Sequence, residues 1–425
     1  MLFCSCTAHS CICKLAMEDN NDEHNVSLPQ DIQHTILASL PARVVLKFRT
    51  VCRFWRDCIQ EPNFVDRHLN NALRSHQSIA CFTSVDEGLV CMYTLDLTTL
   101  NCKRMDLVLS SRFQMSDPCH GLVCAYDLKG AVEVLNPTTR IHLRLPVSEL
   151  QSLASEYFLG PAPSTKEYKV LCVHHRVRFL TFEVCTVGTQ SWRAVRESAA
   201  LLKTTKAVIV NDVMHWLLLD EISSHFTRNI LSFNLTDEMF SETAVPDAVK
   251  DRELHLFEGG GKLHLLAMPG EGSAPKTSEI WVANSTCAVW DHMCNVAFVL
   301  PLGMRPLFLH NNKLFYCNQR RFYYVDLQDG SGSYLNMPFG ECIISAGIFV
   351  ESLALHSVTG LVDSRTMLQR THDARSFPTG RGPSARGAGS SSAGPRRSFK
   401  KAKSNINMQW RDEEEIDHGG GSGTG

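Results

Sequence analysis

The sequence predicts a multidomain protein in which a small α-helical unit precedes a large all-β domain and a disordered tail. Three observations support this prediction. Apolar residues recur at helical spacing from 26 to 70, strand-and-turn patterns repeat from 79 to 356, and apolar periodicity is lost from 357 to 425. We assign 1–25 to a disordered leader that is rich in cysteine and acidic residues, and 71–78 to a linker.

The composition is that of an ordinary globular protein. Of the 425 residues, 44% are hydrophobic and 20% are charged, and the formal net charge is −2. This balance gives no indication of nucleic-acid or membrane partners. The most apolar stretch, residues 295–310, is interrupted by two prolines and Arg305, so we expect no membrane span. The 17 cysteines mostly stand singly in hydrophobic patterns, which indicates reduced, buried thiols in a cytoplasmic or nuclear protein.

Four cysteines lie close together in the leader and allow two interpretations. Cys4, Cys6, Cys11 and Cys13 supply thiols for zinc, copper(I) or lipid attachment, but their C-x-C spacing is tighter than that of structural zinc sites. We therefore favour an incidental segment and expect no metal. Met17 opens a sequence that runs directly into the helical unit, which makes it an alternative start of the protein.

The first helix of the helical unit is predicted from its prolines and its apolar spacing. Pro29 suits the first turn of a helix, and Asp31 lies near the positive end of the helix dipole. Pro41 ends this helix. Four apolar residues follow one another on a single face: Ile32, Ile36, Leu37 and Leu40.

Two more helices follow, over 44–48 and from Val51 to Ile59, and a fourth begins at Pro62. Three helices in about forty residues cannot bury all of their large apolar side chains among themselves. Each such side chain that stays exposed forgoes about 1.5–3 kcal/mol of burial. The sequence therefore predicts a protein partner for this unit, with the core of an ordinary helical subdomain as the alternative.

The stretch LPQDIQHTILASLPARVVLKFRTVCRFWRDCIQEPNF closely resembles the F-box motif, especially its plant form. The resemblance implies a three-helix unit that docks on the Skp adaptor of cullin-RING ubiquitin ligases. It leaves open which residues contact the adaptor and which form the core of the unit. The positions that it assigns to these two tasks are Leu28, Pro29, Ile32, Ile36, Leu37, Leu40, Pro41, Leu46, Val51, Cys52 and Trp55.

The β domain is predicted from a repeated unit. An apolar strand, a turn rich in Thr, Asn, Asp or Gly and a second strand recur every 40 to 50 residues. A weaker repeat of strand pairs lies between these units, which gives about four strands per unit. That period and strand number indicate a β-propeller of about six blades. The equivalent points of the repeat are Asp96, Asn136, Val184, Asn234, Val282 and Asp326.

The same region is similar to the plant F-box-associated, kelch-related domain, although no double-glycine pair recurs at a fixed place in each unit. The resemblance implies that loops at one face of a propeller capture the protein to be ubiquitinated. Four tryptophans are expected to pack between blades rather than to form a ligand cage: Trp192, Trp216, Trp281 and Trp290. The matching segments are CHGLVCAYD (119–127), VLNPTTR (134–140), EYKVLCV (167–173), VGTQSWR (187–193), VMHWLLL (213–219) and SFNLTDEMF (232–240).

The sequence indicates no catalytic residue, no cofactor and no metal. EGGGKL (258–263) lacks residues of a phosphate-binding loop and is predicted to be a hairpin turn. PCHGLVC (118–124) has the wrong cysteine spacing for a zinc deaminase and fits a strand pair. His174 and His175 point to opposite faces of a strand, which makes a poor chelate, and both are expected at the surface. A propeller enzyme stays an alternative without identified site residues.

Together, the two resemblances imply a non-catalytic substrate-recognition subunit of a Skp–cullin–F-box ubiquitin ligase. Its expected partners are the Skp adaptor, through it the cullin and the RING subunit, and an unidentified target protein. The alternative is a propeller scaffold that works outside any ligase. The basic run PRRSFKKAK (395–403) is either a nuclear-localisation signal or an ordinary tail, so cytoplasmic and nuclear locations are both expected.

Overall fold

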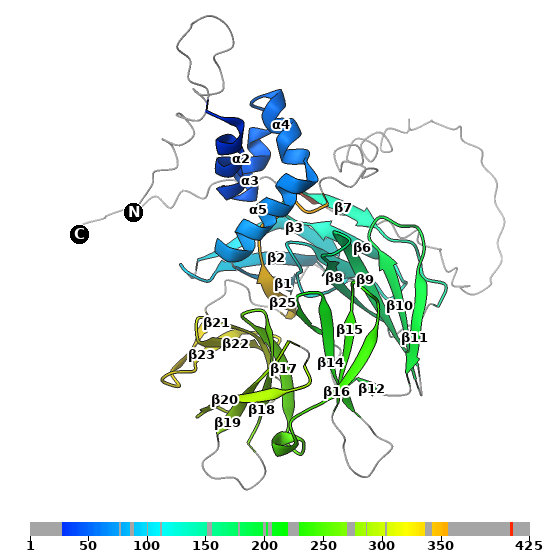
Figure 1. Cartoon of the computed structure of the whole chain (residues 1–425), viewed down its shortest axis with the longest axis vertical. Coiled ribbons are helices and arrows are strands. Elements are labelled where there is room, and N and C mark those ends of the chain that lie inside the picture. Colours follow the sequence, from blue (N-terminus) through cyan, green and yellow to red (C-terminus); the bar gives the residue numbers. More distant parts are fainter. Residues whose placement is uncertain are drawn as a thin grey trace, which may run out of the picture.

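The protein is described by a computed structural model of residues 28–75, 78–85, 89–99, 101–110, 113–150, 155–176, 179–198, 201–202, 206–219, 229–269, 277–285, 287–301, 304–335, 342–355 and 409–410. Over these residues, a helical unit lies on one side of a β domain (Figure 1). None of the helices in these ranges has the length and apolar content needed to cross a membrane. The leader, its four cysteines and the basic run fall outside the described residues.

The helical unit contains α2 (Gln30–Ser39), α3 (Ala42–Phe48), α4 (Arg53–Gln60) and α5 (Pro62–Ser75). Pro29 and Pro41 immediately precede α2 and α3, where their missing N–H groups leave no helical hydrogen bond unmade. Val51 and Cys52 were predicted inside the third helix but precede α4. Cys52 is its N-cap, and its Sγ accepts a bond from the N–H of Trp55 over 3.4 Å.

The predicted linker at 71–78 is wrong for most of its length. Helix α5 continues to Ser75, and β1 begins at Ser78. Asn71 ties α5 to α2, since its side-chain amide donates to the carbonyl of Ala38 over 3.1 Å. The buried face of α5 continues through Ala72, which is 8% exposed, so tertiary packing extends the helix.

The strands of the β domain alternate with short turns throughout. They are β1 (Ser78–Val85), β2 (Leu89–Asp96), β3 (Cys102–Ser110), β4 (Gln114–Met115), β5 (Val123–Tyr126), β6 (Val132–Asn136), β7 (Ile141–Arg144), β8 (Ser155–Ala162), β9 (Glu167–His175), β10 (Leu180–Thr186), β11 (Arg193–Ser198), β12 (Leu201–Leu202), β13 (Val208–Val210), β14 (Val213–Leu219), β15 (Asn229–Asn234), β16 (Phe240–Ala244), β17 (Leu254–Gly259), β18 (Lys262–Ala267), β19 (Ser278–Ala283), β20 (Trp290–Val296), β21 (Arg305–His310), β22 (Lys313–Cys317), β23 (Phe322–Asp326), β24 (Gly332–Leu335), β25 (Ile343–Phe349) and β26 (Gln409–Trp410), with a 3₁₀ helix at Asp247–Val249.

Consecutive strands pair antiparallel in sets that we call strand groups 1 to 6. In the order of their hydrogen bonding they are β25-β1-β2-β3, β4-β5-β6-β7, β8-β9-β10-β11, β13-β14-β15-β16, β17-β18-β19-β20 and β21-β22-β23-β24. Groups 5 and 6 share one sheet through a short parallel contact between β17 and β21. Group 1 joins the two ends of the β domain, because the late strand β25 pairs with the early strand β1.

The hydrophobic cores of the β domain lie between strand groups. Each of six clusters contains apolar residues from two neighbouring groups, in the order 1–2, 2–3, 3–4, 4–5, 5–6 and 6–1. Over the described residues the groups therefore follow one another in a closed ring. Each sheet is apolar on both faces because it packs on a neighbour at each face.

The tryptophans pack between the strand groups, as predicted. Trp216 has no exposed surface and meets the ring of Phe158, from the neighbouring group, edge-on at 5.4 Å between ring centroids. Trp192 is partly buried against the cluster between groups 2 and 3, and Trp281 and Trp290 are partly buried against the cluster between groups 4 and 5.

The predicted repeat points are structurally equivalent, since each lies on the third strand of a different strand group. Their side chains explain the repeated Asp and Asn. The carboxylate of Asp96 accepts the N–H of Thr98 and Thr99 over 2.8 and 2.7 Å. The side-chain oxygen of Asn136 accepts the N–H of Thr138 over 2.9 Å in the same way. These side chains fix the turn to the fourth strand.

Residues 351–355, which we call the returning segment, follow β25 and connect the β domain to the helices. Leu353 has no exposed surface and belongs to the core of the helical unit. The Asn136 amide donates to the carbonyls of Ser352 and Ala354 over 3.1 and 2.9 Å. Arg43 of α3 forms an ion pair with Glu351 at 2.9 Å. The last part of the β domain thus completes the first domain of the chain.

Of the tail predicted to be disordered, 357–425, the structure describes residues 409–410 alone, and these two depart from the prediction. Gln409 and Trp410 form β26 and pair with Val108 and Leu107 of β3. The reason is geometric, because β3 is the outer strand of group 1 and offers unpaired backbone groups at its edge.

The cysteines of the described residues are free thiols, and most are buried. This agrees with the predicted reduced state. Burial raises the pKa of Cys58 and of Cys102 to about 11, so both thiols stay protonated and unreactive near neutral pH.

Candidate functional site

Helix α2 presents apolar side chains to solvent. Ile32 is 46% exposed and Ile36 is 38% exposed, whereas the next residue, Leu37, is 1% exposed. Ile32 and Ile36 lie four residues apart, so their side chains are neighbours on the helix surface. We call this pair the isoleucine stripe. The helix therefore has two apolar faces, one in the core and one open to a partner.

The structure divides the predicted F-box positions into three classes of exposure. The buried residues form the core, in which Phe48 and Trp55 meet at 5.2 Å between ring centroids. The indole N–H of Trp55 donates to Gln33 over 2.8 Å, which ties α4 to α2. Buried positions are Leu37 and Trp55; half-buried positions are Leu28, Leu40, Leu46, Val51 and Cys52; exposed positions are Pro29, Ile32, Ile36 and Pro41.

The β domain encloses a cavity of about 740 Å³ at the centre of the ring of strand groups. Every strand group contributes to its wall through its first strand or the residues beside it, among them Pro161 of β8, Leu256 of β17 and Ile348 of β25. Leu73 of α5 also lines it, so a helix of the first domain borders the cavity of the second.

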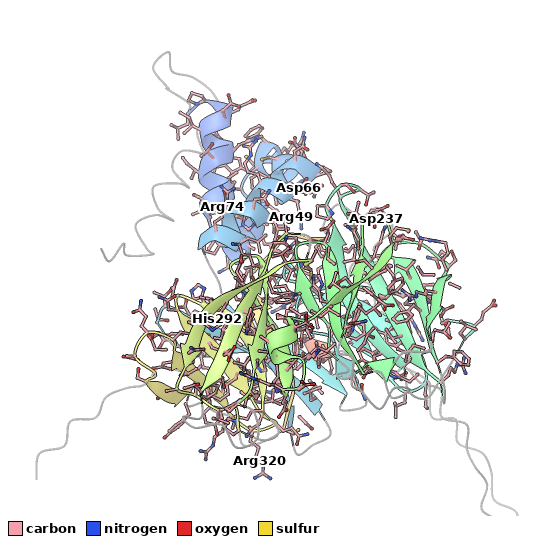
Figure 2. All side chains as sticks on the ribbon, turned by 60° about the horizontal axis from the view of Figure 1, so that its bottom comes forward. Arg49, Asp66, Arg74, Asp237, His292 and Arg320 are labelled. Atoms are coloured by element: carbon pink, nitrogen blue, oxygen red, sulfur yellow. The ribbon has the colours of Figure 1, made fainter. Side chains whose placement is uncertain are left out.

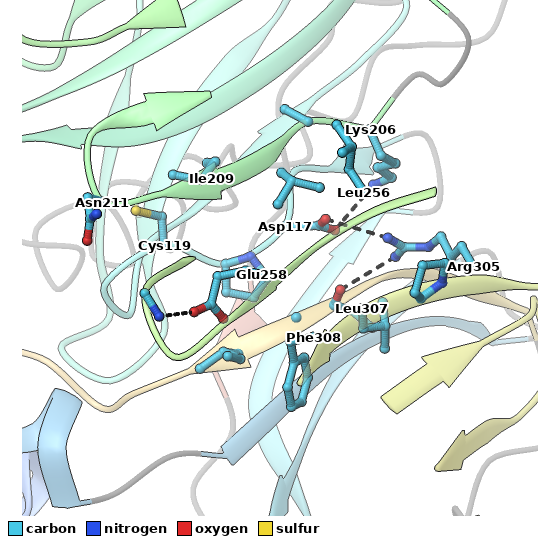
Figure 3. Close-up of a pocket in the computed structure, with 18 of the residues that line it drawn as sticks. Asp117, Cys119, Lys206, Ile209, Asn211, Leu256, Glu258, Arg305, Leu307 and Phe308 are labelled. Atoms are coloured by element: carbon cyan, nitrogen blue, oxygen red, sulfur yellow. Dashed lines mark hydrogen bonds and ion pairs between the residues drawn. The ribbon is translucent and has the colours of Figure 1, made fainter. Parts of the chain in front are cut away.

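Three charged side chains meet in this cavity (Figure 3). The carboxylate of Asp117 lies 3.4 Å from Nζ of Lys206 and 3.6 Å from Nη1 of Arg305. The hydroxyl of Ser345 donates to the same carboxylate over 2.7 Å. Burial opposes the charge of Asp117, but Lys206 and Arg305 lower its pKa below the usual value, so the carboxylate stays ionised. We call Asp117, Lys206 and Arg305 the channel triad.

The sequence analysis missed the channel triad. Its members belong to strand groups 2, 4 and 6, and Asp117 and Lys206 are 89 residues apart. The signal was a charged residue at, or within two residues of, an end of the first strand of every second strand group. Only the closed ring shows that such positions face one another.

A second carboxylate, Glu258, lines another part of the cavity wall. Its Oε1 accepts the N–H of Gly261 over 2.8 Å in the turn between β17 and β18. Burial raises the pKa of Glu258. The segment EGGGKL is thus a hairpin turn, as predicted. Gly260 and Gly261 take positive φ values of 57° and 74°, which glycine adopts without strain.

The prediction that both adjacent histidines lie at the surface is wrong for His174. Its side chain has no exposed surface, because Nε2 lies 2.7 Å from Glu183 and Nδ1 lies 2.8 Å from Oγ of Ser155. These contacts resemble those of a hydrolase triad. Complete enclosure of the imidazole leaves no room for a substrate beside it, and the contacts satisfy polar groups between neighbouring strands. His175, on the other face, is half-buried.

Comparisons with known proteins match the same order of domains, a helical domain followed by a β-propeller domain. A family model described as "F-box associated beta propeller domain" matches residues 68–316, and one described as "F-box domain" matches 26–67. The chain is 26% identical to F-box protein At5g18160 of Arabidopsis thaliana, over 62% of this chain and 68% of the relative. It is 25% identical to F-box/LRR-repeat/kelch-repeat protein At1g09650 of the same plant, over 72% and 91%.

Among solved structures, oligogalacturonate lyase in complex with manganese is similar with a TM-score of 0.38 and 9% identity, over 60% of this chain and 77% of that chain. A similarity of this size carries no argument about the present chain. Within the described ranges, no group of three His, Cys, Asp or Glu side chains is placed to hold a metal ion.

Proposed function

Because the chain belongs to the family of F-box proteins with an F-box-associated β-propeller domain, we propose that it is the substrate-recognition subunit of a Skp–cullin–F-box ubiquitin ligase. The observation that carries this proposal is the isoleucine stripe of α2. Exposed apolar side chains beside a finished core indicate a protein partner. The chain then acts by proximity, since it holds a target near the ubiquitin-conjugating enzyme and raises the local concentration of the target lysine.

The adaptor-contacting residues in this proposal are those with accessible apolar surface: Leu28, Pro29, Ile32, Ile36, Leu40, Pro41, Leu46, Val51 and Cys52. Leu37 and Trp55 are assigned to the core instead, because a partner has almost no surface of theirs to contact. Ile32 and Ile36 are placed at the centre of the interface as the most exposed of its large aliphatic side chains.

We propose six propeller blades, one for each strand group. The ring of interblade cores supports this count, as does the shortness of the parallel contact between groups 5 and 6. We place target capture on the side of the propeller away from the helices. Arg320, in a loop there, lies at the end of the molecule opposite the helical unit (Figure 2).

The test is co-purification of the full-length chain with the Skp adaptor and the cullin. An Ile32→Asp, Ile36→Asp variant places two charges in the proposed interface and should lose both partners. Asn70→Asp, on the exposed side of α5, adds a charge elsewhere on the helical unit and should keep them. Thermal unfolding of both variants shows whether the helical core is intact. The proposal is wrong if the folded double variant binds the adaptor as tightly as the wild type.

The alternative function is a propeller scaffold that works outside any ligase. The presence or absence of the cullin in the purified complex distinguishes the two functions. A wild-type complex that contains the adaptor but excludes the cullin would support the scaffold. A complex that contains both, and that ubiquitinates a protein captured by the propeller, supports the ligase subunit.

A further inference from the structure

The outer edge of β3 is partly covered by the C-terminal part of the chain itself. Gln409 and Trp410 of β26 pair antiparallel with Val108 and Leu107, in the second half of β3. Because β3 is the outer strand of strand group 1, its other edge positions have no strand beside them in the described part of the chain. An open edge of this kind accepts a further strand through backbone hydrogen bonds.

The strand β3 is longer than the outer strands of the other groups. It contains nine residues, whereas β7, β11, β16, β20 and β24 contain four to seven. The two residues of β26 use only a small part of this edge. Residues 102–106, which precede the paired positions, leave room for a longer strand.

This open part of the edge begins with two cations. Lys103 and Arg104 are exposed, and neither forms an ion pair with any of the residues that the structure describes. The guanidinium of Arg104 donates to Sγ of Cys91 over 3.1 Å, a weak acceptor that leaves its charge uncompensated. By contrast, Arg193 and Arg196 of the outer strand β11 form ion pairs with carboxylates of strand group 4, at 2.6 and 2.9 Å.

The register of β26 directs the acidic end of the chain toward these cations. Because the pairing is antiparallel, each step from β26 toward the C-terminus is one step back along β3. On this register Glu413 falls opposite Arg104, and Glu414 falls opposite Lys103. Residues 412–415 are all acidic, so a shift of one residue in either direction keeps carboxylates opposite both cations. Opposite charges that face each other across two strands stabilise the pair.

The order of charges in the tail favours this direction of the added strand. The basic run 395–403 precedes β26, and the acidic residues follow it. A parallel strand at the same place would bring the basic run toward Lys103 and Arg104, where like charges repel. The tether does not impose the choice of strand. Residues 356–408, at up to about 3.3 Å each, are long enough to reach the outer strands of other groups.

We propose that the edge of β3 is the docking site of the chain's own acidic segment, residues 411–414, which continues β26 with its carboxylates against Lys103 and Arg104. The added strand covers an edge with which another chain could otherwise pair, and covering an edge is one way in which natural sheets avoid association. The inference does not depend on the isoleucine stripe or on the role of the chain in a ligase.

The experiment is amide hydrogen exchange of the full-length chain, measured by mass spectrometry on peptides that cover β3. A docked segment protects the outward N–H groups of β3, and a segment bound about nine-tenths of the time slows their exchange about tenfold. A Glu413→Lys, Glu414→Lys variant should lose this protection, because like charges then face each other across the pair. Peptides from β1 and β2 in the same experiment show whether the sheet stays folded.

Two further variants test the cause of the protection. Adding Lys103→Glu and Arg104→Glu to the reversed acidic segment restores opposite charges and should restore the protection. Asp363→Lys, Asp373→Lys makes the same change of charge elsewhere in the tail and should leave exchange on β3 unchanged. Unchanged exchange on β3 after reversal of the acidic segment overturns the proposal. Protection that increases with protein concentration also overturns it, since the docked segment would then belong to a second copy of the chain.

Discussion

Ile32, Ile36 and Leu37 lie close together on one short helix and have opposite surroundings. Leu37 contacts only protein, whereas the two isoleucines keep much of their surface in water. Sequence alone cannot make this distinction, because both kinds of position are apolar and both follow helical spacing. The difference comes from where α3, α4 and α5 pack.

This difference predicts separate effects on stability and on binding. Leu37→Ala should lower the free energy of unfolding of the helical unit by about 2–5 kcal/mol, because it leaves a cavity in a core. Ile32→Ala should change that free energy by about 0.5 kcal/mol or less and weaken only adaptor binding. Urea denaturation and a binding titration on the same two variants check the prediction. Equal destabilisation by both would mean that Ile32 belongs to the core.

His215 predicts a pH dependence of stability. Burial lowers the pKa of its imidazole to about 4, and Nδ1 lies 2.8 Å from Oγ of Ser232. Between pH 4 and 6.5 the unfolded chain binds a proton at this residue that the folded chain does not. Stability is therefore full above about pH 6.5 and falls as the pH is lowered toward 4, by on the order of 3 kcal/mol for this group.

Chemical denaturation at pH 7, 6, 5 and 4 measures this effect. His215→Gln retains a polar side chain without a titrating ring, so its stability should fall less over the same interval. Other histidines whose pKa is lowered by burial, such as His120, contribute in the same direction, so some slope should persist in the variant. Parallel slopes for wild type and variant would contradict the assigned role of His215.

At the scale of elements, the sequence predicted the helices and the strand repeat well. The reason is local, since prolines mark helix starts and Asp or Asn side chains fix turns within a few residues of themselves. The prediction from sequence failed where contacts with residues distant in the sequence determine the surroundings of a side chain. His174 is buried because Ser155 and Glu183 come from neighbouring strands. The channel triad escaped notice because ring closure, not sequence distance, brings its members together.

The returning segment predicts that the two domains unfold together. A chain that ends at residue 350 lacks Leu353 and the carbonyls that Asn136 binds, whereas a chain that ends at 355 keeps them. Calorimetry should show one main transition for the longer chain and a separate transition at lower temperature for the helical unit of the shorter one. The reason is that loss of a buried leucine leaves a cavity in the helical core. Identical melting curves for the two chains would contradict this.

At the scale of the whole molecule, two connections join the helical unit to the propeller. One is the passage of the chain from α5 into β1, and the other is the returning segment. A separate ion pair joins Lys166, in the turn between β8 and β9, to Asp66 of α5 at 2.7 Å. Under the proposed function, this attachment would hold a captured target in a fixed direction relative to the adaptor. Fixed geometry favours transfer to lysines within reach.

A double attachment predicts tolerance of a flexible insertion. In a chain that ends at residue 355, six Gly and Ser residues are inserted between α5 and β1. This insertion should leave the radius of gyration in solution scattering nearly unchanged, because the returning segment still holds the two domains together. The same insertion in a chain that ends at residue 350 should increase it. An increase already present in the chain that ends at 355 would show that the returning segment does not hold the domains together.

The returning segment also has a consequence for folding during synthesis of the chain. The helical unit leaves the ribosome first, but its core stays incomplete until Leu353 is made, after nearly all of the propeller. Until then the nascent helices lack one buried leucine of their core. A prematurely terminated chain has neither a closed propeller nor a finished helical core. The order of translation thus makes completion of the helical unit depend on completion of the propeller. Under the proposed function, a truncated chain would therefore offer the adaptor an incomplete helical unit.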